Sequence, residues 1–258
     1  MRLFLKRGGA CLCLICLWQA CVTQKADYGA ALIPPDLPPA APLIKEDHRL
    51  SVDEERVALT KAYMGIHNQK WVEPAGNGAA AIAFTPRILV VHYTSIPTLE
   101  EVVAYFEPPT IASDRGIVTQ NGSLNVGIQF IVDRDGTIYG SYPETAIARH
   151  TIGLNHTAIG IENVGNADLG SVEDDQTRPL TEAQLEANIL LTRYLVGKYP
   201  TIHFLIGHME YQNLEDPDHP AHELFQEDLP AYRTDKVDPG PRFLKALRRG
   251  LQSSKSDP

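Results

Sequence analysis

Cysteine is almost absent from this chain of 258 residues, and all four copies lie in its first 21 positions, at Cys11, Cys13, Cys16 and Cys21. The sequence after Cys21 therefore contains no thiol. This excludes a disulfide, a cysteine nucleophile and a thiolate metal site from that part of the chain.

Clustered basic residues are also lacking: the formal charge is −9, and aromatic residues make up only 7%. Binding to phosphate backbones needs grouped Lys and Arg, so nucleic acid is not expected as a partner. No apolar run reaches the roughly 20 residues that cross a bilayer as a helix. The remaining composition, 43% hydrophobic and 21% charged, is that of a globular protein with one domain of about 200 residues.

The first 21 residues have the pattern of an export signal. Arg2, Lys6 and Arg7 precede a short apolar run at 10–18. The end of this segment, 17–21, resembles a bacterial lipoprotein processing site, although Trp18 and Gln19 depart from the usual pattern. We expect a signal peptide at 1–20, lipidation of Cys21 as the first mature residue, and a lipid anchor as the sole membrane attachment. This corresponds to an outer-membrane lipoprotein on the periplasmic side. An ordinary cleaved signal, or a segment left uncut, is the alternative.

A proline-rich segment follows the signal. Five prolines fall between Gly29 and Leu43, which favours extended polyproline II structure. We therefore expect a spacer at 22–50 and a single domain at 51–252.

Within this domain, apolar strands alternate with capped helices. The capping-box spacing predicts helices that begin near Ser51, Thr98 and Thr181, and a last helix follows Pro239-Gly240. Apolar β-branched runs predict strands at 87–91, 125–132, 137–142, 158–164 and 202–206. These elements predict an α/β fold with a mixed central sheet flanked by helices.

Three side chains that can bind a metal each lie where regular structure stops. His92 ends an apolar strand, His208 follows another strand, and Asp238 precedes the last helix. Two imidazoles, one carboxylate and an open fourth position form a known type of catalytic zinc site. Taken singly, His92 could be a core histidine and Asp238 a charge at a helix N-terminus.

Glu162 is a further candidate because it lies in the apolar strand 158–164. It either points to solvent by alternation or lies in a site, where it could move protons between water and a leaving amine.

Five short fragments occur in one order along the chain: 90–94 (VVHYT), 148–155 (ARHTIGLN), 159–162 (IGIE), 207–208 (GH) and 236–240 (KVDPG). Together they resemble the zinc-dependent N-acetylmuramoyl-L-alanine amidases of the type-2 family, relatives of the peptidoglycan recognition proteins. The resemblance covers about 87–247 and includes the hairpin at 130–139.

This resemblance implies one Zn²⁺ per chain, held by His92, His208 and Asp238. It implies that Glu162 activates the attacking water and that Lys236 stabilises charge on the carbonyl oxygen. The implied reaction hydrolyses the amide between the lactyl group of N-acetylmuramic acid and L-alanine of the stem peptide. Peptidoglycan or muropeptides would be the substrate of a monomeric enzyme.

The fragment 148–155 matches the family segment that lines the substrate cleft. His150 is therefore expected to contact substrate, with Asn155 in support; alternatively, both residues only order the loop.

The chain departs from many relatives in the interval between His208 and Asp238, which spans 30 positions. We expect an inserted loop at 209–235 that forms a lid or rim beside the site. Simple surface elaboration is the alternative, and His219 or His222 could replace one of the assigned ligands.

Two other functional classes compete with an enzyme. One is a non-catalytic peptidoglycan-binding module of the same superfamily, which typically lacks a zinc ligand. The other is a structural lipoprotein that uses the domain as a spacer.

Overall fold

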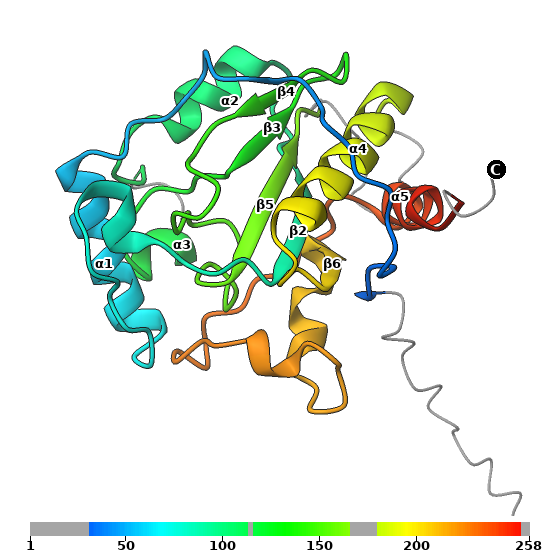
Figure 1. Cartoon of the computed structure of the whole chain (residues 1–258). Coiled ribbons are helices and arrows are strands. Elements are labelled where there is room, and N and C mark those ends of the chain that lie inside the picture. Colours follow the sequence, from blue (N-terminus) through cyan, green and yellow to red (C-terminus); the bar gives the residue numbers. More distant parts are fainter. Residues whose placement is uncertain (1–30, 113–115, 166–179, 254–258) are drawn as a thin grey trace, which may run out of the picture.

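The computed structural model describes residues 31–112, 116–165 and 180–253, and a six-stranded mixed sheet lies at its centre (Figure 1). The strand order is β1-β4-β3-β5-β2-β6, with β3 and β4 antiparallel and the other neighbours parallel. The strands are β1 (Ile44–Lys45), β2 (Ile88–Tyr93), β3 (Phe130–Val132), β4 (Ile138–Gly140), β5 (Ala158–Asn163) and β6 (Phe204–Gly207). The expected mixed α/β architecture is confirmed.

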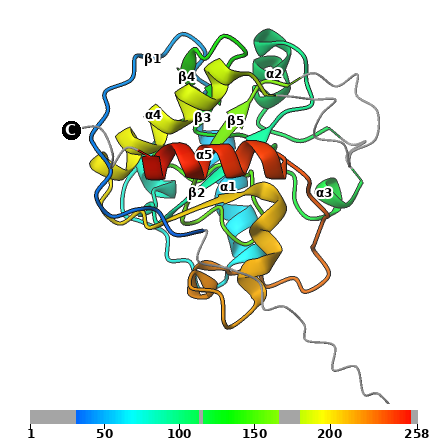
Figure 2. The same cartoon turned by 90° about the vertical axis from the view of Figure 1, so that its right-hand side faces the viewer.

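Helices cover both faces of this sheet (Figure 2). They are α1 (Glu54–His67), α2 (Leu99–Phe106), α3 (Ile117–Gln120), α4 (Glu182–Lys198) and α5 (Pro241–Ser253), together with the 3₁₀ segments η2 (Gly78–Ile82), η3 (His208–Glu215) and η4 (His222–Leu224). Helices α4 and α5 lie across one face, and α1 lies behind the opposite face. In the part of the chain that the structure describes, no helix is both long and apolar enough to cross a membrane.

Side-chain caps determine where three of these helices begin. Thr98 accepts a hydrogen bond from the backbone N–H of Glu101, and Thr181 forms a complete capping box with Gln184, which confirms two expected helix starts. The expected start at Ser51 is wrong. Asp53 caps α1 instead, because its carboxylate accepts from the N–H of Arg56 at 2.8 Å.

Alternation along β2 decides which side chains face the site. Leu89 and Val91 belong to the core cluster beneath α4 and α5, whereas Ile88 and Val90 pack into the cluster on the opposite face. All four are fully buried. Because strand side chains alternate, His92 lies on the same face as Ile88 and Val90, away from α4 and α5.

Residues 31–50, which we call the N-terminal arm, contact both edges of the sheet. At one edge the N–H of Ile33 donates to the carbonyl of His203 (2.9 Å). At the other edge β1 pairs in parallel with β4, and the N–H of Leu50 donates to Ser141 (2.8 Å). The arm therefore covers backbone groups that an edge strand would otherwise expose.

The arm corrects the expected free spacer at 22–50: residues 31–50 are packed, and 22–30 lie outside the described residues. The physical reason is the set of apolar residues between the prolines. Ile33, Leu37 and Ile44 pack against the core beneath α4 and α5, and burial of apolar surface outweighs the preference for a solvated extended chain. The expected signal and Cys21 also lie outside the described residues.

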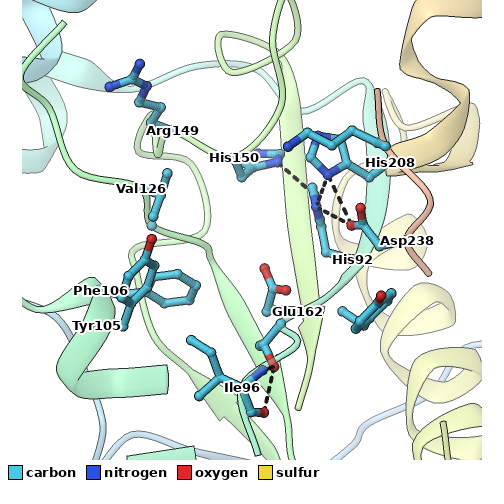
Figure 3. A pocket seen from close by; sticks show the side chains of 14 residues that line it. His92, Ile96, Tyr105, Phe106, Val126, Arg149, His150, Glu162, His208 and Asp238 are labelled. Carbon is cyan, nitrogen blue, oxygen red and sulfur yellow. Dashed lines mark hydrogen bonds and ion pairs between the residues drawn. The ribbon is translucent and has the colours of Figure 1, made fainter. Parts of the chain in front are cut away.

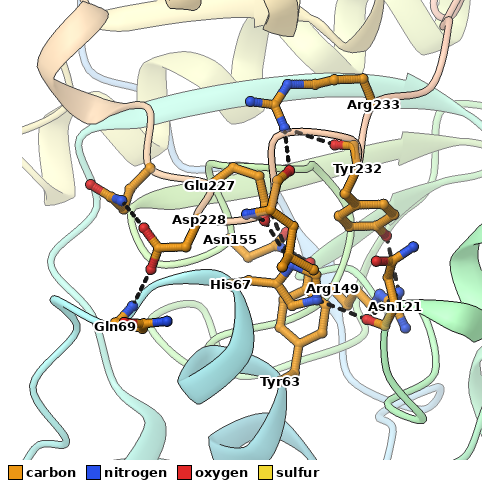
Figure 4. Close-up of polar contacts among 12 residues, drawn as sticks. Tyr63, His67, Gln69, Asn121, Arg149, Asn155, Glu227, Asp228, Tyr232 and Arg233 are labelled. Atoms are coloured by element: carbon orange, nitrogen blue, oxygen red, sulfur yellow. Dashed lines mark hydrogen bonds and ion pairs between the residues drawn. The ribbon is translucent and has the colours of Figure 1, made fainter.

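The inserted segment 209–235, which we call the insertion, is joined to α1 by a buried polar contact (Figure 4). Nδ1 of His67 lies 2.9 and 3.0 Å from the two carboxylate oxygens of Glu227, and Nε2 lies 2.8 Å from the carbonyl oxygen of Asn121. Both ring nitrogens thus face oxygen atoms. The Glu227 side chain is fully buried. This buried polar contact holds the insertion against the domain.

Glu227→Gln should lower the free energy of unfolding by about 3 kcal/mol, because it removes a buried carboxylate whose two oxygens both contact Nδ1 of His67. Urea unfolding of the full-length chain measures this loss. Glu215→Gln is the matched control, since it breaks a more exposed pair with Arg233 in the same insertion and should cost less than about 1 kcal/mol. Equal effects of the two substitutions would contradict a stabilising role for the buried pair.

Candidate metal and catalytic site

The register of three parallel strands aligns the first members of the site. In the pairing of β2 with β5, His92 is the Cα partner of Glu162. In the pairing of β2 with β6, Val91 is the partner of Gly207, so His208 follows at the level of His92. The ends of three neighbouring strands therefore bring a carboxylate and two imidazoles to one edge of the sheet.

Asp238 reaches this edge through the turn before α5. The N–H of Met209 donates to the backbone carbonyl of Asp238 at 2.9 Å, which fixes the turn beside His208. Gly207 permits the approach, because a Cβ at this position would lie 2.8 Å from the ring of Pro239. The glycine before the histidine is thus a packing requirement of the site.

His92, His208 and Asp238 converge, and we call them the triad (Figure 3). The Nδ1 atoms of the two histidines are 3.0 Å apart, and Oδ2 of Asp238 lies 3.1 Å from Nδ1 of His208 and 3.3 Å from that of His92. A tetrahedral zinc with ligand distances of about 2.0–2.1 Å requires its donors to be about 3.3 Å apart. The three donors fit a zinc ion in type and in spacing.

The triad leaves room for a fourth ligand. Within the described residues, the metal-competent group that includes His92 contains these three side chains and no other. His219 and His222, the alternative ligands, are not part of it: Nδ1 of His219 accepts from the N–H of Ala221, and Nδ1 of His222 contacts the carbonyl of Leu214. A site with three protein ligands keeps a position for water or substrate.

Local electrostatics suit metal binding. Burial lowers the pKa of His208 to about 4, although the carboxylate of Asp238 acts in the opposite direction. Burial alone would raise the pKa of Asp238, but contacts with His208 and His92 prevail and hold that pKa well below its usual range. Near neutral pH, His208 is therefore neutral and Asp238 ionised, which are the forms that bind metal.

Glu162 and Lys236 line the same cleft as the triad, and this cleft has a volume of about 200 Å³. Glu162 is 8% exposed. Its burial, followed by repulsion from Asp238, raises the pKa of Glu162 well above the ordinary value, and Lys236 opposes this shift. The alternative of a solvated strand residue is therefore excluded by its position, because Glu162 is buried and faces the cleft.

His150 and Asn155 occupy one loop beside the triad. The Nδ1 atom of His150 lies 3.2 Å from Nε2 of His92, and His150 lines the cleft. Asn155 is buried, and its side-chain oxygen accepts from the backbone N–H groups of His150 and Thr151. Loop order is therefore a visible role of Asn155. Contact of either residue with substrate remains a prediction.

The cleft also contains residues that the sequence analysis did not select. These are Tyr93, Thr94, Ile96, Tyr105, Phe106, Val126, Gly127 and Arg149. Several of these residues could have been found from their position in the sequence. Tyr93 and Thr94 follow His92 directly, and Tyr105 and Phe106 lie at the end of a predicted helix. Arg149 directly precedes His150 in the fragment 148–155. Val126 carries no comparable signal, because it reaches the cleft only through the packing of a distant loop.

A second, narrower pocket continues from the cleft toward the insertion. The two share Val126, Arg149, His150, His208 and Lys236, and the second pocket adds Tyr232 and Thr234 of the insertion. Two residues of the insertion therefore line a pocket that adjoins the cleft. That the whole segment 209–235 forms a lid or rim stays a prediction.

One family model identifies the family of this chain. The family model described as N-acetylmuramoyl-L-alanine amidase (type 2) matches residues 83–241, more than half of the chain. The endolysin of Escherichia phage T7 is 36% identical over 80 residues, covering 31% of this chain and 51% of the relative. The endolysin of Klebsiella phage KP32 is 34% identical over 68 residues, covering 26% and 43%. The chain thus spans about half the length of the curated relatives it matches.

Two of the solved structures that are similar to this chain are the following. N-acetylmuramoyl-L-alanine amidase LysC from Clostridium intestinale is 30% identical, with a TM-score of 0.36 over 55% of this chain and 83% of that chain. A selenomethionine derivative of AmpD is 23% identical, with a TM-score of 0.42 over 70% and 96%.

Proposed function

The chain belongs to the N-acetylmuramoyl-L-alanine amidase family, and we propose that it is a zinc-dependent enzyme acting on peptidoglycan or muropeptides. The bond we assign is the amide between the lactyl group of N-acetylmuramic acid and L-alanine of the stem peptide. One observation carries the proposal: the three donors of the triad lie in a single cleft with a buried glutamate and a lysine.

Zinc held by His92, His208 and Asp238 would act as a Lewis acid that polarises the scissile carbonyl and makes water more acidic. The described residues fit this ion by the chemistry and spacing of their donors. The remaining steps are performed by side chains of this chain.

Glu162 is placed to move the protons. As a carboxylate it takes one proton from the attacking water while the water oxygen bonds to the carbonyl carbon. As a carboxylic acid it returns that proton to the alanine nitrogen when the C–N bond breaks, which releases a neutral amine. The raised pKa of Glu162 suits both halves of this cycle, because the group is a stronger base than an exposed carboxylate.

Lys236 is placed to stabilise charge. Attack on the carbonyl turns its oxygen into an oxyanion, and the ammonium of Lys236 lines the cleft where this charge develops. A fixed cation in a partly dry site lowers the barrier because it needs little reorganisation.

Presence of all five groups favours an enzyme over a non-catalytic binding module. A binder needs the cleft but has no use for a buried glutamate beside a complete triad. A structural spacer would need neither, and it would contain no bound zinc.

Incubation of the zinc-loaded full-length chain with purified muropeptides should release free stem peptide and intact disaccharide. Mass spectrometry of the products identifies the bond. A chelator should abolish release, and added zinc should restore it. Cleavage within the sugar or the peptide would refute the assigned bond. Binding without cleavage would establish the non-catalytic alternative.

Glu162→Gln should retain zinc but lower kcat by about 10²- to 10⁴-fold, because the proton carrier is lost. Lys236→Met should lower kcat by about 10²- to 10³-fold with little change in KM. Steady-state kinetics and zinc content measured on the same preparations check both outcomes. The controls are Glu100→Gln and Lys245→Met, which change exposed residues outside the cleft. Turnover at the wild-type rate in either cleft variant would remove its assigned role.

We also propose export and anchoring through Cys21, on the basis of the basic and apolar pattern of 1–21 and the resemblance of 17–21 to a lipoprotein processing site. Bacteria that express the full-length chain should incorporate labelled palmitate into it. Cys21→Ser should lose the label, whereas Cys16→Ser should keep it. Absence of label from the wild-type chain would exclude the anchor.

A further inference from the structure

The outer nitrogen of His92 has two polar neighbours on the side of the ring that faces away from the triad. Its Nε2 atom lies 3.2 Å from Nδ1 of His150 (Figure 3) and 3.3 Å from Oγ1 of Thr151. The two neighbours are also in contact with each other, at 2.8 Å. Three polar groups thus form a closed set directly behind a proposed metal ligand.

A backbone carbonyl determines which ring nitrogen of His150 carries a proton. Its Nε2 atom lies 3.3 Å from the carbonyl oxygen of Ala158, which can only accept a hydrogen bond, so Nε2 carries the proton. The hydroxyl of Thr151 lies 2.8 Å from Nδ1 of His150 and can donate to it, so a neutral ring satisfies both of its nitrogens. The Nδ1 atom of a neutral ring protonated at Nε2 has a lone pair and no proton. It is therefore an acceptor.

The number of protons available to His92, His150 and Thr151 then determines which ring nitrogen of His92 is protonated. With the proton on Nε2 of His92, that N–H donates to Oγ1 of Thr151 or Nδ1 of His150, and the hydroxyl of Thr151 donates to Nδ1 of His150. Every group in the set is satisfied. With the proton on Nδ1 of His92, that N–H faces Oδ2 of Asp238 at 3.3 Å. The single hydroxyl proton of Thr151 then faces two lone pairs, however, and one buried nitrogen behind the ring loses its partner. With Nδ1 unprotonated, its lone pair can instead accept from Nδ1 of His208 at 3.0 Å.

We propose that His150, assisted by Thr151, is a positioning residue that holds His92 with its proton on Nε2 and its Nδ1 lone pair directed into the triad. The inference rests on the proposed function in that Nδ1 is prepared for zinc. It assigns His150 a role besides the expected contact with substrate. Partners behind a ligating histidine orient its ring and select its tautomer.

Two features of the surrounding chain keep this set in place. The side-chain oxygen of Asn155 accepts from the N–H groups of His150 and Thr151, at 2.9 and 2.8 Å, which fixes the backbone that carries both side chains. Gly160 leaves space for the imidazole, because a Cβ there would lie 3.0 Å from Nδ1 of His150 and 2.1 Å from Cδ1 of Ile128. The loop and the strand beside it are thus shaped around the His150 ring.

The tautomer of His92 can be read without metal or substrate. Long-range ¹H–¹⁵N spectra of the metal-free full-length chain, with ¹⁵N-labelled histidine, distinguish a protonated from an unprotonated ring nitrogen. His92→Ala identifies the His92 signals. We expect wild-type His92 to be protonated at Nε2 and His150→Phe to show a mixture of tautomers. Protonation of wild-type His92 at Nδ1 would overturn the proposal.

Zinc affinity gives the second readout, by competition with a chromogenic chelator. His150→Phe should bind zinc about 10- to 100-fold more weakly than the wild type, as for other partners of metal-bound histidines. His150→Gln should recover part of this loss, since its amide oxygen can accept from His92. The control is His156→Phe, which makes the same change in the same loop at a residue lining a separate groove, and it should bind like the wild type.

The two proposals fail in different ways. A wild-type chain that takes up no zinc refutes the proposed function, whatever the tautomer of His92. A wild-type chain that binds zinc, together with a His150→Phe variant of equal affinity and unchanged His92 tautomer, refutes the positioning role alone. If His150→Phe does not fold, the wild-type tautomer and the His150→Gln affinity still decide.

Discussion

The in-register parallel pairing of β2 with β5 and β6 is the constraint on which the site depends. It places His92 beside Glu162 and one residue beyond the Val91–Gly207 pair, so the proposed metal ligands and the proposed proton carrier share one level of the sheet. A shift by one residue would turn His92 toward α4 and α5. The apolar residues that set the register, such as Leu89 and Val91, are fully buried beneath those helices. Core packing on the sheet face beneath α4 and α5 thus aligns His92 and Glu162 on the opposite face.

Two carboxyl groups in one cleft have opposite electrostatic behaviour. Asp238 is surrounded by His208 and His92, which lower its pKa, whereas burial and Asp238 itself raise that of Glu162. Asp238 is therefore ionised near neutral pH, whereas the raised pKa of Glu162 makes that group the stronger base. Such a divergence of similar groups is how a single site provides both a ligand and an acid–base residue. It also explains why the two positions cannot exchange roles.

Local signals in the sequence predicted much of the fold. Apolar runs located the central strands, and Thr98 and Thr181 marked helix starts, because caps and alternation depend on residues close in sequence. The cap of α1 was misplaced by two positions, since Ser51 and Asp53 offer competing oxygens and only the tertiary environment selects one. The prediction that the three residues of the triad converge came from a family resemblance, not from their spacing in the sequence.

Other features depend on contacts that no local pattern contains. The approach of His150 to His92 joins residues 58 positions apart, and the pair between His67 and Glu227 joins residues 160 positions apart. The packing of the N-terminal arm was missed for a related reason. Prolines in the arm indicate extension correctly, but extension is equally compatible with lying along the edge of a sheet. Whether such a strand is solvated or docked is decided by the surface that it meets.

The docked arm also determines how far a lipidated form of this protein could extend from its membrane. Ala31 is the first residue that the structure describes, and it is buried. A chain running from an anchor at Cys21 to Ala31 spans at most roughly 35 Å when fully stretched. Ala31 packs near Ile88, at the beginning of β2, whereas His92 lies toward the end of that strand. In a form anchored at Cys21, as proposed above, the cleft would lie toward the opposite end of β2 from the point where the connecting chain meets the domain. The length of that chain would limit how far from the membrane the cleft can act.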